Sequence, residues 1–211
     1  MCKISRLSIG CSSKFSPKAM LEDSDQVKHL MIHMSYCHGA IKNETTTQKS
    51  SSHKIHHWHN WSNTDSNQIS YIFSLTDHLS GRTLGVYVVF VKLDLGLHGR
   101  LLSWNLVSLV GPPQQQQQIT ADFYLMKNKR SKSKIRPLWG TESVPSMMWS
   151  VKSMDITKYH DFVSLPLKQR LERIFTIPLT HLETYYVEDE SSAELTWHIT
   201  FQCKENAVNR Q

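Results

Sequence analysis

The sequence predicts an α+β fold, in which a mainly antiparallel sheet carries one or two covering helices and follows a flexible N-terminal arm. Two observations predict this class: apolar and polar residues alternate from Gln68 onward, and apolar residues recur at helical spacing in two other places. A third observation, the polar composition of residues 42–67, divides the chain. We expect an arm over 1–67, with one short helix and a His- and Ser-rich linker, and an α+β core domain over 68–211.

The arm is expected to hold one helix, over Ser24–His38, which Gly39 ends. Its apolar residues occupy the i, i+3, i+4 and i+7 positions of one helix face: Val27, Leu30, Met31 and Met34. The segment 42–67 has few apolar side chains: Ile55, Trp58 and Trp61. Because these bury too little surface to offset the entropy of ordering the chain, we expect a flexible linker there.

The core is expected to begin with four strands. Alternation predicts the first over 68–75, and the Val-, Tyr- and Phe-rich segment Leu84–Leu95 predicts a strand that is buried on both faces. Leu101–Val110 and Ile119–Met126 predict two more strands.

The C-terminal third predicts a helix and a hairpin. The helix begins at Ser164 and presents one apolar face to the sheet: Leu167, Leu171, Ile174 and Phe175. The hairpin joins Thr184–Glu188 to Glu194–Lys204 through a turn of about four residues. Its second strand places alternate residues on one face: Leu195, Trp197, Ile199, Phe201 and Cys203.

Composition and charge limit the classes of protein. The chain has 211 residues, with 24 Lys and Arg against 18 Asp and Glu, and a net charge of +6. Its longest apolar run, Leu84–Val91, is far shorter than the roughly 20 residues of a membrane-spanning helix. Basic residues interrupt the segment before Met20, so no secretory signal is expected. Together with four scattered cysteines, these features predict an intracellular protein of the nucleus or cytoplasm, with association with a membrane as the alternative.

A basic segment is the strongest functional signal. Six cations and no acid occupy ten consecutive residues: Lys127, Lys129, Arg130, Lys132, Lys134 and Arg136. Such a density neutralises phosphates, so binding to nucleic acid is the leading interpretation. A nuclear localisation signal, a site for anionic lipid headgroups and a plain solvated loop are the alternatives.

Histidines suggest a metal site only weakly. One group lies in the linker, at His53, His56, His57 and His59, and a second steps by four residues along the first helix, at His29, His33 and Cys37. His29 and His33 share a helix face and could both reach one zinc ion. However, no glutamate follows His29 in the metalloprotease spacing and the sequence has no Cys-x-x-Cys pair, so no metal ligand and no cofactor is expected. The adjacent pairs Asp77–His78 and His160–Asp161 carry little information on catalysis. We therefore predict no catalytic residues and no enzyme activity.

Three functional hypotheses follow. The first is a small, basic, non-enzymatic binding or scaffold protein that engages nucleic acid, RNA or DNA, or a nucleoprotein through the basic segment. The runner-up is a peripheral protein of matrix type, which self-associates into a homo-oligomer and bridges an anionic membrane and a nucleoprotein. The size and charge of this chain are similar to those of viral accessory or structural proteins. This likeness is a general analogy and not a family resemblance. The third hypothesis is a metal-dependent enzyme that uses the histidine cluster.

Overall fold

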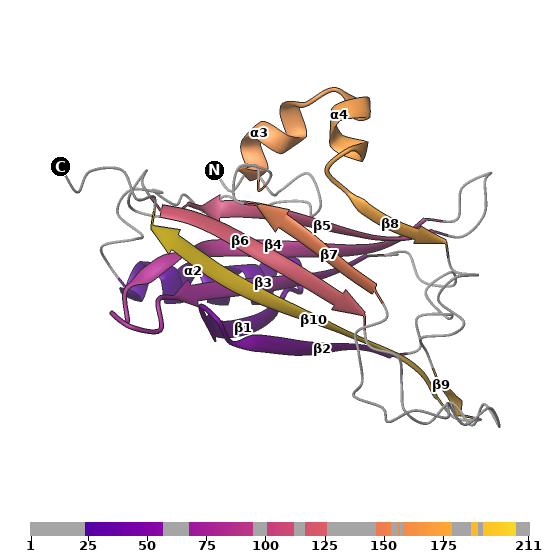
Figure 1. Ribbon diagram of the computed structural model, residues 1–211, viewed down its shortest axis with the longest axis horizontal. Coiled ribbons are helices and arrows are strands. Elements are labelled where there is room, and N and C mark those ends of the chain that lie inside the picture. The colour runs from indigo at the N-terminus through magenta and orange to yellow at the C-terminus, as the bar shows by residue number, and fades with distance from the viewer. Residues whose placement is uncertain are drawn as a thin grey trace.

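The computed structural model describes residues 24–56, 68–94, 101–111, 117–125, 147–152, 156, 158–178, 187–189 and 192–205. This part of the chain forms two five-stranded sheets, with helices against one of them (Figure 1). The predicted α+β class with mainly antiparallel pairing is confirmed.

Sheet A has the strand order β1-β3-β4-β5-β8, and only its β1–β3 pair is parallel. Its strands are β1 (Ile41–Thr46), β3 (Gln68–Thr76), β4 (Thr83–Asp94), β5 (Leu101–Val110) and β8 (Phe175–Pro178). Sheet B has the order β2-β10-β6-β7, with β9 pairing to β10, and its pairs are antiparallel. Its strands are β2 (Ser50–His56), β6 (Gln117–Leu125), β7 (Met147–Lys152), β9 (Val187–Asp189) and β10 (Ser192–Glu205).

The larger core lies between the two sheets. Sheet B contributes alternate side chains of β10 to this core, as the sequence predicted. Four of them are fully buried: Leu195, Trp197, Ile199 and Phe201. Sheet A is buried on both faces. In β4, Tyr87 and Val89 face this core, whereas Val86 and Val88 face the opposite side. The prediction of a strand buried on both faces is therefore confirmed for β4.

A second core lies between sheet A and the helices. Helix α2 has the predicted bounds, Ser24–His38, and its apolar face packs on β3, β4 and β5. Gly39 ends α2 in a left-handed conformation, with φ of 62°, and the next N–H, that of Ala40, donates to the carbonyl of Met34 over 3.0 Å. Glycine is favoured at such a helix end because a Cβ resists positive φ.

The predicted linker is wrong over residues 42–56, because these residues form β1 and β2. Both are edge strands, held by backbone hydrogen bonds to β3 and β10, so they need few apolar side chains. Over 41–54, where side-chain burial is described, the buried residues are the inward-facing Thr45 and His53 and, in the turn between the strands, Thr47. Residues 57–67 lie outside the described part of the chain, and the division into two domains at residue 67 stays a prediction.

The predicted helix after Ser164 is also wrong in part. Only the short helix α4 (Leu167–Leu171) stands in its place, with Leu167 and Leu171 exposed, and Phe175 belongs to β8. Another short helix, α3 (Tyr159–Ser164), precedes α4. The two are separated at Leu165, which is extended (φ −68°, ψ 147°), because the residue before a proline is pushed out of the helical region. Among the described helices, none is long and apolar enough to cross a membrane.

Candidate functional site

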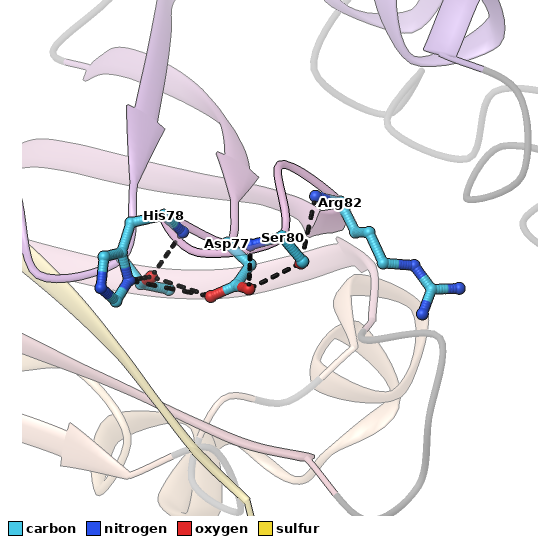
Figure 2. A network of polar contacts seen from close by, with 5 residues as sticks. Asp77, His78, Ser80 and Arg82 are labelled. Atoms are coloured by element: carbon cyan, nitrogen blue, oxygen red, sulfur yellow. Dashed lines mark hydrogen bonds and ion pairs between the residues drawn. The ribbon is translucent and has the colours of Figure 1, made fainter.

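A network of polar contacts joins two turns (Figure 2). Asp77 organises the β3–β4 turn. Its Oδ2 accepts hydrogen bonds from the backbone N–H of Ser80 at 2.9 Å and from the Ser80 hydroxyl at 2.6 Å. Its own N–H donates to the carbonyl of Arg82 over 2.8 Å. An aspartate that bonds to backbone groups a few residues ahead is a common way to stabilise a tight turn.

Thr47 connects this turn to the one between β1 and β2. Its Oγ1 lies 3.0 Å from Nδ1 of His78 and accepts the His78 backbone N–H over 3.2 Å. The Thr47 N–H donates to the Thr76 carbonyl of sheet A over 2.9 Å, and the N–H of the next residue, Gln48, donates to the Phe201 carbonyl of sheet B over 2.7 Å. The β1–β2 turn is therefore bonded to both sheets.

The electrostatics of the network favour a charged carboxylate. The hydrogen bonds from the side chain and then the backbone of Ser80 hold the pKa of Asp77 below its usual value, with a smaller contribution from His78. Hydrogen bonds to the charged form have this effect because protonation would remove an acceptor.

Asp, His and hydroxyl groups meet here, but not in the geometry of a catalytic triad. In a triad the carboxylate and the nucleophile bond to opposite nitrogens of the imidazole. Here Asp77 Oδ1, at 3.8 Å, and Thr47 Oγ1, at 3.0 Å, both approach Nδ1 of His78. Ser80 bonds to Asp77 instead, Thr47 is only 3 % exposed, and the side chain of Arg82 points away (Figure 2). The network holds two turns together and does not activate a nucleophile.

The two histidine groups are not brought together as a metal site. His29 and Cys37 are exposed on α2, and the ring of His33 packs edge-on against His38 at 5.2 Å. On the described residues, no group of three His, Cys, Asp or Glu side chains is placed to hold a metal ion. His57 and His59 lie outside these residues.

His53 has a different role, because it belongs to the core. Its ring is 7 % exposed and lies 4.7 Å from the ring of Trp197 and 5.1 Å from those of Tyr71 and Phe73. No described residue hydrogen-bonds to its Nε2. Burial, with a smaller contribution from His198, lowers the pKa of His53 to about 4. The imidazole is therefore neutral at physiological pH.

The basic segment Lys127–Arg136 lies outside the described residues, so its six cations are placed only by the strands that flank it. Strand β6 ends at Leu125 and β7 begins at Met147, and these two residues are register partners. The chain between them thus leaves and re-enters sheet B at one end of one strand pair.

Sequence reasoning missed Thr47, because its contact with His78 joins residues far apart in the chain and nothing near Thr47 marks it. The position of Ser80 in a turn could have been predicted, since Asp77, Ser80 and Gly81 are residue types typical of turns. No protein-family model and no curated protein matches the chain.

Proposed function

We propose that the chain is a small, basic, non-enzymatic binding protein that engages nucleic acid through the segment Lys127–Arg136. The observation that carries this proposal is the run of six cations without an acid in ten residues. Each contact between such a cation and a phosphate releases counterions, so affinity comes from charge and depends strongly on salt. The sequence of the segment contains no motif that reads base edges, so we expect little sequence preference.

The flanking strands anchor the stretch of chain that contains this segment. Leu125 and Met147, on either side of that stretch, are register partners in β6 and β7, and the basic segment begins two residues after Leu125 and ends eleven residues before Met147. Substitutions within the segment are expected to leave the sandwich intact, because the β6–β7 pairing and the core residue Phe123 lie outside it.

The test is the salt dependence of binding to a single-stranded oligonucleotide. With about four to six phosphates neutralised, the slope of log K against log salt is expected to be roughly −3 to −4. A basic-segment variant replaces four cations by glutamine: Lys129, Arg130, Lys132 and Lys134. It is expected to flatten the slope by about 3, at roughly 0.7 per contact with a single strand.

The matched control removes four exposed cations elsewhere, again by glutamine: Lys28, Lys42, Lys49 and Arg82. Both variants have the same net charge, so a general charge effect would change their slopes equally. If the basic-segment variant binds the oligonucleotide as wild type does, the proposal fails. If it keeps nucleic-acid binding and loses only binding to anionic vesicles, the segment is a lipid site and the matrix-type function replaces the first.

A further inference from the structure

Three apolar side chains lie exposed on α3 and α4. Leu167 and Leu171, which are 64 % and 58 % exposed, lie one turn apart on α4, and Val163 of α3 is 39 % exposed. We call these three residues the α3–α4 outer surface. Large apolar groups that cluster on a surface indicate a contact with something other than water.

The fold does not require this surface for its own packing. The segment is held to sheet A from its other side, where Phe162 is buried and Tyr159, Leu165 and Ile174 pack against the second core. The ring of Tyr159 lies 6.1 Å from that of Phe90 in β4. Because these contacts already anchor α3 and α4, the outer leucines are not needed to hold the helices in place.

The charges around the outer surface are mainly positive. Cations in and next to α3 and α4 are Lys158, Lys168, Arg170 and Arg173, against the acids Asp161 and Glu172. All except Arg170, which is half-buried, belong to exposed residues. Leucines that alternate with lysine and arginine are typical of helices lying in a membrane interface, where apolar side chains enter the acyl boundary and long basic ones reach the phosphates.

Shape and composition favour a lipid surface over a protein partner. Helices α3 and α4 project beyond the two sheets at the upper edge of the molecule (Figure 1), which suits contact with a flat surface. Protein interfaces centre on tryptophan, tyrosine and arginine, whereas leucine and valine are under-represented at their hot spots. The outer surface consists of the latter types.

We infer that the α3–α4 outer surface docks the protein on an anionic lipid bilayer. Val163, Leu167 and Leu171 enter the interface, and Lys168 and its basic neighbours contact the headgroups. The inference does not depend on nucleic-acid binding, because it uses residues on another part of the chain.

The test is co-sedimentation of the full chain with vesicles of phosphatidylcholine and phosphatidylserine, and of phosphatidylcholine alone. The parent protein in this assay is the basic-segment variant, so that the cations of Lys127–Arg136 contribute less to binding. We expect binding to the anionic vesicles only. The double variant Leu167→Ser and Leu171→Ser is expected to bind them about 10- to 100-fold more weakly, since each inserted leucine contributes up to roughly tenfold.

The matched control changes two exposed apolar residues elsewhere, Leu79→Ser and Ile32→Ser, which are 84 % and 46 % exposed. It is expected to bind as the parent does. Thermal unfolding should be unchanged in both double variants, because all four side chains face solvent. Equal binding by the two double variants would overturn the inference, as would no binding by the parent.

A second copy of the chain is the competing occupant, and sedimentation velocity without lipid tests it. If the parent forms a dimer that the Leu167 and Leu171 variant does not form, the surface is a protein interface and the lipid inference is wrong. A monomer that binds anionic vesicles through these leucines supports the inference. Oligonucleotide binding by the leucine variant in the wild-type background tests the proposed function separately, and it is expected to be unchanged.

Discussion

Acidification is expected to destabilise the fold through His53, whose imidazole is buried between the two sheets. Its pKa is about 4 in the folded protein and 6.5 for the unperturbed group. The unfolded chain therefore binds a proton below pH 6.5 that the folded chain does not bind. Stability falls as the pH falls from 6.5 to about 4 and then levels off, and above pH 6.5 this group has no effect.

The size of the effect follows from the two pKa values. A difference of about 2.5 pH units corresponds to about 3 kcal/mol, at 1.36 kcal/mol per unit. A folded domain is commonly stable by only 5–15 kcal/mol, so this loss is a large fraction of the total. Burial also lowers the pKa of the half-buried His198, which adds to the loss in the same direction.

The assay is urea unfolding between pH 7.5 and pH 4, in wild type and in His53→Phe. Phenylalanine keeps a ring among Tyr71, Phe73 and Trp197 and removes the titrating group, so the variant should lose about 3 kcal/mol less on acidification. The control is His160→Gln, at an exposed position, which should behave as wild type. Equal pH dependence in wild type and His53→Phe would refute the reasoning.

Two further predictions concern packing and the turn network. Trp197→Ala should lower the free energy of unfolding by about 3–5 kcal/mol in urea titrations, because a fully buried ring leaves a cavity; an unchanged midpoint would mean that its face is not the core. Asp77→Ala should cost about 1–2 kcal/mol, because the Ser80 N–H and hydroxyl lose their acceptor. Asp77→Asn, which keeps an acceptor, should cost less in the same titration, and equal losses would show that the bonds to Ser80 do not matter.

Local patterns predicted the elements that bury continuous apolar rows. Helix α2 was placed at both ends, because an apolar face and a glycine stop lie within one stretch of chain. The row along β10 was recognised because alternation extends over its whole inner face. The apolar face assigned to Leu167 and Leu171 was wrong, since periodicity reports that residues share a face and not where that face points.

The elements that the sequence did not reveal depend on distant partners. Strands β1 and β2 are polar, and they form because β3 and β10 offer backbone groups to them, which no pattern within residues 42–56 records. The separation into two sheets has the same cause, since alternation does not say which strand pairs with which. For function, the basic segment was found from charge alone, whereas the Thr47–His78 contact needed the fold.

The position of β10 in sheet B has a consequence for folding during synthesis. This strand pairs with β2, β6 and β9, and the ribosome delivers it after all of them. Sheet A can pair as soon as β8 emerges, but its inner face, with Tyr71 and Trp104, has no complete partner until β10 arrives. A nascent chain stalled before β10 would present an uncovered aromatic face, an unpaired β2 and a β6 that is paired only with β7. Such a state is prone to aggregation, and it is the stage at which a chaperone would matter most.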